Sequence, residues 1–105
     1  MYDMANIRKL KLLGQDAPAA WEAFTAFDKA ALADGAVPKK YKELIALGVA
    51  LTTQCPYCLE IHRKAAEAAG ATQQELAETA LVAAALRAGA AVTHATHILG
   101  GEPPK

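Results

Sequence analysis

The chain has 105 residues, of which 53% are hydrophobic, and its eleven basic residues balance eleven acidic ones. This length gives room for one domain with a real core, but not for two. The balanced charge offers no basic surface of the kind that binds nucleic acid or anionic membranes. We therefore expect a single domain over residues 1–105, with neither nucleic acid nor membrane among its partners.

No segment of the chain has the pattern of a targeting or membrane segment. Residues 1–13 lack the continuous apolar segment and the cleavage site of a signal peptide. The apolar run Leu44–Leu51 is shorter than the roughly 20 residues needed to cross a bilayer, and polar residues interrupt Ala77–Ala95. We expect a cytoplasmic protein whose two cysteines serve redox or metal chemistry rather than a structural disulfide.

The first third of the chain predicts an arm followed by a helix. Residues 1–15 are expected to be irregular. Asp16 resembles an N-cap and Pro18 suits a first helical turn, so a helix is predicted from Pro18 to Ala33. Gly35 ends it. Its large apolar side chains are assigned to the core: Trp21, Phe24, Phe27 and Leu32.

A second helix is predicted from Pro38 to about Thr53. Every residue of Leu44–Leu51 is apolar or glycine, so we expect this helix to be buried on all sides. A strand is the alternative, because Ile45 and Val49 favour strands, but the length of the run favours a helix. Three lysines near its start are interpreted as solvated: Lys39, Lys40 and Lys42.

Strong start signals mark two further helices. Pro56 occupies a first-turn position of a third helix, which Gly70 closes. Thr72 and Glu75 form a capping box at the start of a fourth helix, which is predicted to run to about Arg87. Gly89 is expected to kink or divide it, leaving a short last helix over residues 90–99.

All of these signals are helical, so the predicted fold class is all-α, a compact bundle of five or so helices. Alanine-rich patches at residues 83–85 and 88–91 suit close helix packing within or between subunits. Several short alanine-rich helices leave apolar surface that one copy covers poorly. We therefore expect a homo-oligomer that associates through helix faces.

Both cysteines lie at the start of the third helix. Cys55, Cys58 and His62 fall on one helix face, and Cys58 and His62 are four residues apart, within side-chain reach. Cys55 lies at the positive end of the helix dipole. A nearby histidine and a helix N-terminus both lower the pKa of a thiol, and the thiolate is the nucleophile. The pattern predicts reversible dithiol chemistry.

The residues alone leave open which thiol attacks. The helix dipole favours Cys55, whereas a neighbouring base favours Cys58, with His62 as base or proton relay. The dipole contributes only about 0.3–1 kcal/mol at an exposed site, so the argument leans towards Cys58. Glu43 stands at the edge of an apolar stripe, where an unpaired carboxylate has a raised pKa suited to proton transfer. Alternatively, it is an ordinary first-turn glutamate.

The spacing of these residues resembles a known family. Glu43 and the segment from Cys55 to His62 reproduce the E-x11-C-x-x-C-x3-H signature of alkylhydroperoxidase D-like proteins of the carboxymuconolactone decarboxylase superfamily. The resemblance covers roughly residues 18–99. It implies an all-helical fold, trimers or hexamers, and thiol-dependent peroxidase or disulfide reductase activity without a bound cofactor. The superfamily's decarboxylases generally lack the cysteine pair, so decarboxylation is not expected.

The resemblance also implies roles for individual residues. Cys58 resembles the peroxidatic cysteine, Cys55 the resolving cysteine and proton donor, and Glu43 and His62 the proton relay. The substrate would be a small hydroperoxide or a disulfide, and the reductant an external dithiol, possibly lipoyl-type. Hydroperoxidases of this type carry a second histidine at the position of Tyr57.

Two other functions fit the same residues. One is a non-enzymatic redox sensor or partner protein, in which the disulfide switches assembly. The other is metal binding through Cys55, Cys58 and His62, with His94 or His97 as a fourth ligand. Structural zinc sites usually draw on a second ligand pair in a domain with little core, which makes metal binding the weaker alternative.

Overall fold

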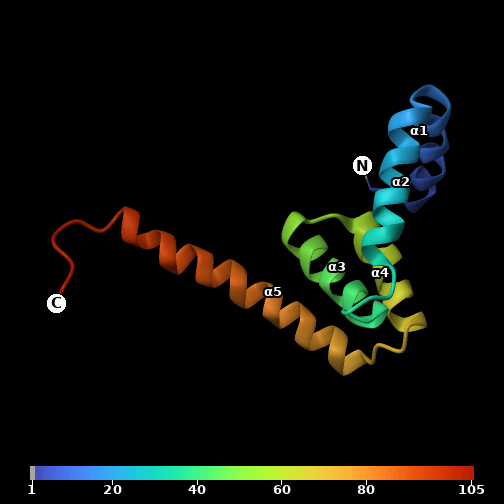
Figure 1. The fold of residues 1–105 in the computed structure, drawn as a ribbon. Helices are drawn as coiled ribbons and strands as arrows, with labels where there is room; N and C mark the ends of the chain where they lie inside the picture. Colours follow the sequence, from blue (N-terminus) through green and yellow to red (C-terminus); the bar gives the residue numbers. More distant parts are fainter. Residues whose placement is uncertain (1) are drawn as a thin grey trace.

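The computed structural model describes residues 2–105, and every regular element in that range is helical. The five α-helices and two short 3-10 helices follow in chain order (Figure 1): η1 (Met4–Lys9), α1 (Leu10–Asp16), α2 (Pro18–Leu32), α3 (Lys39–Thr53), α4 (Pro56–Ala68), α5 (Gln73–His94) and η2 (Ala95–His97). The prediction of an all-α fold with five or so helices is confirmed.

The core lies where α3 packs against α4 and against the first half of α5. Its buried apolar side chains are small apart from one leucine: Leu47, Ala50, Ala66 and Ala83. Alanines at these positions allow the helix axes to approach closely, which holds the α3–α4 pair together. This pair carries all the residues of the predicted site.

A tight turn joins α3 to α4. Gln54 adopts the left-handed conformation at φ 58°, and its N–H donates to the carbonyl of Ala50. The N–H of Cys55 donates to the same carbonyl at 3.1 Å. The chain therefore reverses within two residues, and α4 runs back along α3 from its first turn.

The capping box predicted at Thr72 is present. The N–H of Glu75 donates to Thr72 Oγ1 at 3.1 Å, and the N–H of Thr72 donates to Glu75 Oε1 at 2.9 Å. The predicted division at Gly89 is wrong, because α5 continues through Gly89 to His94, and only the short 3-10 helix η2 follows it. A single glycine costs a helix about 1 kcal/mol, and the alanines around it are the strongest helix formers.

The prediction of an irregular arm over residues 1–15 is wrong for the described residues; Met1 lies outside them. Asp3 caps η1, because its Oδ1 accepts a hydrogen bond from the N–H of Ala5 at 2.9 Å. The N-cap of α2 is Ala17, without a side-chain hydrogen bond, rather than Asp16. A Cβ at Gly14 would lie 2.9 Å from a Trp21 ring atom, so glycine permits the close approach of α1 to α2.

Two sets of side chains assigned to the core are exposed. In α3, Ile45 is 58% and Val49 is 55% exposed, although the helix was expected to be buried on all sides. In α2, Phe24 and Phe27 are also exposed. The physical reason is that α4 and the first half of α5 leave the face of α3 that carries Ile45 and Val49 uncovered, and α2 contacts the α3–α4 pair only slightly.

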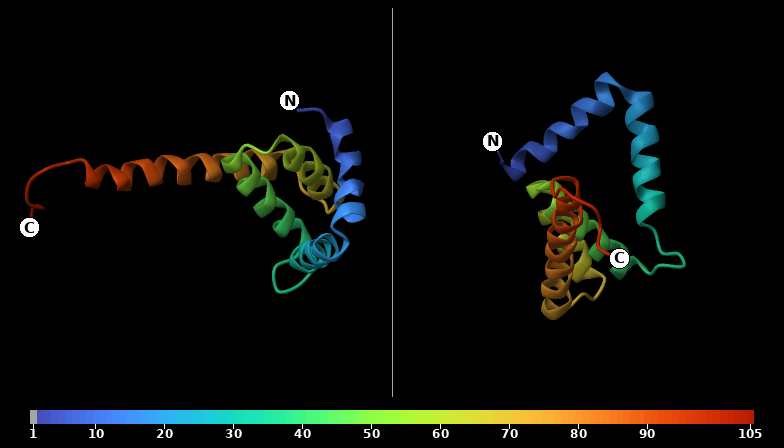
Figure 2. Two further views of the ribbon diagram at one scale, coloured as in Figure 1. Left: turned by 90° about the horizontal axis from the view of Figure 1, so that it is seen from above. Right: turned by 90° about the vertical axis from the view of Figure 1, so that its left-hand side faces the viewer.

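The molecule is elongated (Figure 2). The second half of α5 projects away from the other helices, and α1 and α2 diverge on the opposite side. The radius of gyration is 18.2 Å, whereas a compact chain of this length has about 13 Å. Only α3, α4 and the first half of α5 form the packed part of the fold.

Candidate active site

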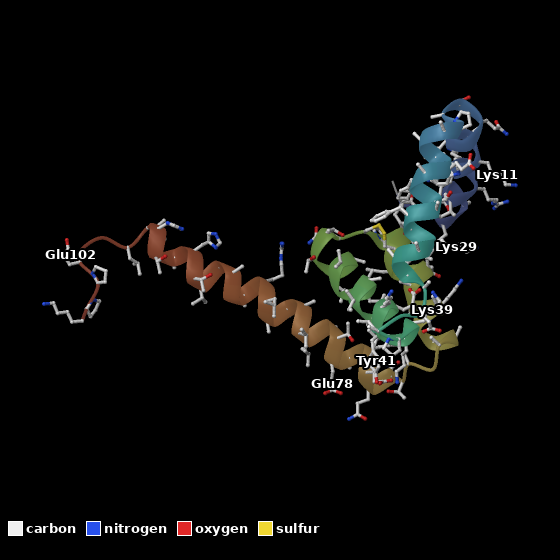
Figure 3. The ribbon with its side chains drawn as sticks, viewed as in Figure 1. Lys11, Lys29, Lys39, Tyr41, Glu78 and Glu102 are labelled. Atoms are coloured by element: carbon white, nitrogen blue, oxygen red, sulfur yellow. A yellow bond between two sulfur atoms is a disulfide. The ribbon has the colours of Figure 1, made fainter. Side chains whose placement is uncertain are left out.

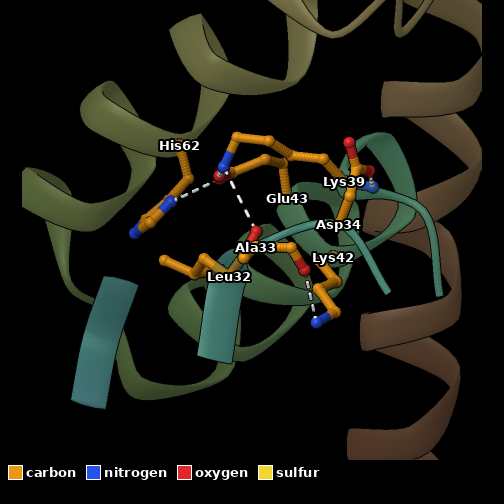
Figure 4. A network of polar contacts seen from close by, with 7 residues as sticks. All are labelled: Leu32, Ala33, Asp34, Lys39, Lys42, Glu43 and His62. Atoms are coloured by element: carbon orange, nitrogen blue, oxygen red, sulfur yellow. Dashed lines mark hydrogen bonds and ion pairs between the residues drawn. The ribbon is translucent and has the colours of Figure 1, made fainter. Parts of the chain in front are cut away.

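A buried carboxylate on α3 contacts the histidine of α4. Glu43 shares the inner face of α3 with Leu47 and Ala50 and is only 2% exposed. Its Oε2 lies 2.6 Å from Nδ1 of His62 (Figure 4). Because α4 runs back along α3, residues 19 positions apart in the sequence meet across the helix pair. The sequence placed Glu43 and His62 on two successive predicted helices.

The second oxygen of this carboxylate binds a lysine. Lys39 Nζ lies 3.0 Å from Glu43 Oε1 and donates to the carbonyl of Leu32 at 3.3 Å. The N–H of Lys39 in turn donates to Asp34 Oδ1 at 2.6 Å, which fixes the start of α3. Glu43 is thus held on both sides, by Lys39 and by His62 (Figure 4).

These contacts decide the ionisation of Glu43. Burial alone would raise the pKa of Glu43, but the hydrogen bonds from His62 and Lys39 outweigh it and lower the pKa below its ordinary value of 4.5. The carboxylate is therefore charged at neutral pH, and the sequence-based expectation of a raised pKa applies only to an unpaired group. A charged acceptor at 2.6 Å makes a strong hydrogen bond to the imidazole.

The lowered pKa of Glu43 predicts how stability depends on pH. Above pH 4.5 the carboxylate is ionised in the folded and unfolded states, so its full contribution to the free energy of unfolding is present. As the pH falls through the lower folded-state pKa, the contribution is lost. We expect the difference in free energy of unfolding between wild type and Glu43→Gln to shrink between pH 7 and pH 3, measured by urea denaturation.

The matched control for this experiment is Glu102→Gln, on the exposed C-terminal segment. This variant should stay as stable as wild type at both pH values. A Glu43→Gln difference that is the same at pH 7 and at pH 3 would contradict the assignment of the charge to Glu43.

The two cysteines form a disulfide at the start of α4. Cys55 is the N-cap of α4, and its Cα lies 5.3 Å from that of Cys58. The N–H of Cys58 donates to Cys55 Sγ at 3.3 Å. The N-cap position therefore directs a backbone donor at the first sulfur, which stabilises negative charge on it. Figure 3 shows the disulfide in yellow at the start of α4.

Helical spacing relates His62 to the cysteine pair. His62 follows Cys58 by four residues on α4 and is 21% exposed. The hydrogen bond to Glu43 occupies Nδ1 and favours the tautomer with its proton there, which leaves the lone pair on Nε2. Within the described residues Nε2 has no protein hydrogen-bond partner, so it is available to a reduced thiol one turn away.

Tyr57, between the two cysteines, contacts the N-terminal segment. Its hydroxyl oxygen accepts from the N–H of Asp3 at 3.4 Å and from Asn6 Nδ2 at 3.3 Å, and its ring packs edge-on against Tyr2. In this disulfide form the phenol therefore holds η1 against α4. It has no hydrogen bond to Glu43 or His62.

The structure adds Lys39 to the candidate site. The three lysines lie at the start of α3 and stay at least partly exposed, as predicted for a solvated helix start. Each also has a polar partner, which the sequence did not predict: Glu43 for Lys39, Glu75 for Lys40 and the Ala33 carbonyl for Lys42. The i, i+4 spacing of Lys39 and Glu43 was the available signal.

The other two histidines lie far from the site. His94 and His97 are neighbours at the C-terminal end of α5, with rings 5.6 Å apart. That end projects from the packed part of the fold (Figure 1), so neither histidine joins the cysteines of its own chain. Among the described residues, no three potential metal ligands gather.

Several known proteins are similar to this chain in sequence. Residues 18–100 match the family model described as carboxymuconolactone decarboxylase family. A relative from Paracoccus denitrificans, called uncharacterized protein 4 in cox locus, is 50% identical over 78 residues, which cover 74% of this chain and 70% of that protein. An uncharacterized protein of Cupriavidus necator is 36% identical over 92 residues, covering 88% and 81%.

Two solved structures share the fold at 35% identity. One is an apo carboxymuconolactone decarboxylase family protein from Legionella pneumophila, with a TM-score of 0.72 and coverage of 76% of this chain and 71% of that one. The other is a protein from Methanobacterium thermoautotrophicum, with a TM-score of 0.77 and coverage of 82% and 97%.

Proposed function

The chain belongs to the carboxymuconolactone decarboxylase family, which includes alkylhydroperoxidase D-like proteins, and we propose that it is a thiol-dependent peroxidase or disulfide reductase. The observation that carries this proposal is a buried, charged glutamate that orients His62 one helical turn from a disulfide-forming cysteine pair. A structural disulfide needs no such base, whereas reversible thiol chemistry does.

The first step oxidises Cys58. In the reduced protein His62 Nε2 takes the proton of the Cys58 thiol, and Glu43 stabilises the resulting imidazolium. The thiolate attacks one peroxide oxygen and the O–O bond breaks. Cys58 becomes a sulfenic acid, and the leaving alkoxide takes a proton from His62 to become an alcohol.

The second step forms the disulfide. Cys55 attacks the Cys58 sulfenic sulfur, the S–O bond breaks, and the hydroxide takes a proton to leave as water. The N–H of Cys58 and the positive end of α4 stabilise the Cys55 thiolate for this attack. An external dithiol, possibly lipoyl-type, then reduces the disulfide and is itself oxidised. We place the cycle in the cytoplasm, where such reductants are maintained.

A thiol count tests the proposal. One equivalent of a small hydroperoxide, added to reduced protein, should remove two free thiols per chain and yield one alcohol. With excess dithiol the protein should turn over many equivalents, and a disulfide substrate should be tested in parallel. Unchanged thiols with both substrates would overturn the proposal.

Other outcomes would point to the alternative functions. Slow stoichiometric oxidation, with a change of oligomer size and no turnover, would indicate the redox sensor. One equivalent of zinc bound to the reduced protein and lost from His62→Gln would indicate metal binding through Cys55, Cys58 and His62.

Lys39 offers a further test of the relay. Lys39→Gln removes a hydrogen bond from Glu43 Oε1, and we expect turnover about twofold to fivefold lower, with the larger loss at acid pH. Lys64→Gln, at a more exposed salt bridge on α4, is the matched control and should match wild type. Lys39→Arg should restore most of the activity. Identical pH profiles for the Gln variants would remove Lys39 from the site.

A further inference from the structure

A further inference, which rests on the proposed function, concerns the loop between α2 and α3. Asp34 lies in this loop, and its Oδ1 accepts a hydrogen bond from the backbone N–H of Lys39 at 2.6 Å. Lys39 is the first residue of α3, where backbone N–H groups have no partner within the helix. Pro38 occupies the N-cap position and makes no side-chain hydrogen bond. Asp34 therefore caps α3 in place of an N-cap side chain.

The side chain of the same lysine reaches the candidate site. Lys39 Nζ lies 3.0 Å from Glu43 Oε1, one turn further along α3, and 3.3 Å from the carbonyl oxygen of Leu32 at the end of α2. Figure 4 shows Asp34, Lys39 and Glu43 within this network. The contact between residues four apart requires helical geometry at Lys39, and the ends of helices fray. The bond from Asp34 holds Lys39 in that geometry.

Two charged groups lie against the Glu43 carboxylate, Lys39 from α3 itself and His62 from α4. The side chain of Glu43 is 3% exposed, whereas that of Lys39 is 45% exposed. Water therefore competes for the lysine ammonium group, and its contact with Glu43 depends on how well the backbone of Lys39 is fixed. Without this contact, His62 alone would hold the buried carboxylate.

Asp34 acts on the backbone of Lys39 rather than on its charge. Within residues 2–105, no ion pair joins the Asp34 carboxylate to the Lys39 ammonium group. A second lysine offers a comparison, because Lys42 Nζ donates to the carbonyl of Ala33 at 2.6 Å and, among the described residues, has no hydrogen bond to Glu43. Lys42 thus ties the end of α2 to α3 without contacting the site.

We propose that Asp34 is a positioning residue of the active site. By holding the first turn of α3, it keeps the Lys39 ammonium group on Glu43, and through Glu43 it keeps His62 oriented to take the proton of Cys58. In the described part of the chain, Asp34 has no hydrogen bond to Glu43 or His62, so its effect passes through Lys39.

Steady-state turnover with excess dithiol tests this role. Asp34→Ala should lower kcat/KM about twofold to fivefold. The loss should be larger at acid pH, because a Glu43 carboxylate without the lysine becomes protonated at a higher pH. Asp34→Asn keeps an oxygen acceptor for the N–H of Lys39 and should restore most of the activity.

A double variant shows whether the effect passes through the lysine. Asp34→Ala combined with Lys39→Gln should be no slower than Lys39→Gln alone, because both changes remove the same contact with Glu43. Losses that add in the double variant would overturn the proposal.

An NMR titration separates this proposal from the proposed chemistry. The side-chain carboxyl carbon of Glu43 reports its protonation in the disulfide form, where no turnover is needed. The pKa of Glu43 should be higher in Asp34→Ala than in wild type, and should return towards the wild-type value in Asp34→Asn. This result would support the role of Asp34 even if wild type reduced neither hydroperoxides nor disulfides. An unchanged pKa in Asp34→Ala would overturn it.

Two control variants complete the test. Asp28→Ala removes an exposed α2 carboxylate that has no hydrogen bond or ion pair among the described residues. Lys42→Ala loosens the end of α2 but leaves the bond from Asp34 to Lys39 in place. Both should keep wild-type turnover, Glu43 titration and helical circular dichroism. If Lys42→Ala reproduced the changes of Asp34→Ala, general order in the loop would explain them and the proposal would fail.

Discussion

Cys58→Ser is expected to reduce hydroperoxide turnover at least about 10³-fold, to the background of the free dithiol, because a serine hydroxyl cannot replace the thiolate. Cys58 lies one helical turn before His62, and the charged Glu43 holds Nδ1 of that histidine by a hydrogen bond. The remaining Cys55 has no histidine one turn away on α4. The measurement is the steady-state rate with excess dithiol, together with free thiols after one equivalent of hydroperoxide.

Cys55→Ser separates the two roles. This variant should still react once with hydroperoxide, consume its single thiol, and give a Cys58 sulfenic acid that a dimedone-type reagent traps. Turnover should be lost because no partner closes the disulfide. If Cys58→Ser instead gives the trapped sulfenic acid and Cys55→Ser does not react, the helix-dipole argument is the correct one and the two roles are exchanged.

Glu43→Gln is expected to lower kcat/KM by about 10²–10⁴-fold, the usual contribution of a positioned acid–base group. The substitution keeps the size of the side chain but removes the charge that holds His62 Nδ1. His62→Gln should have a comparable effect. Because the two residues act as one unit, the double variant should be little worse than either single variant.

The control for these single and double variants is Glu60→Gln. Glu60 is a half-buried glutamate on α4 whose ion pairs with Arg63 and Lys64, at 3.9 Å and 3.8 Å, are longer than those of Glu43. It should retain activity close to wild type. Circular dichroism and thermal unfolding must show that Glu43→Gln is folded at the assay temperature. Independent, additive losses from Glu43→Gln and His62→Gln would show that the two residues do not form a relay.

The disulfide form also has a consequence for Tyr57. Its hydroxyl accepts two long hydrogen bonds from the N-terminal segment, so it holds η1 rather than serving Cys58. The family's second histidine would stand at this position. In this chain the proposed relay therefore consists of Glu43, His62 and Lys39, and the hydroxyl of Tyr57 ties the N-terminal segment to the start of α4.

Local signals predicted much of the helical framework. The proline at the start of α4, the capping box at Thr72 and the apolar run of α3 each act within a few residues, so sequence alone located these elements. The grouping of Cys55, Cys58 and His62 on one face also follows from helical periodicity alone. The prediction at Gly89 shows the limit of such signals, because this glycine was expected to kink or divide a helix that its alanine neighbours maintain.

Contacts between distant residues required the tertiary structure. The α3–α4 turn at Gln54 brings Glu43 onto His62, and only that contact, with the one from Lys39, makes the pKa of Glu43 fall rather than rise. The exposure of α3 likewise depends on which helices pack against it. The sequence by itself determined where helices begin and which side chains share a face, because these are short-range properties. The tertiary structure alone decided charge and burial, because both depend on what the rest of the chain places nearby.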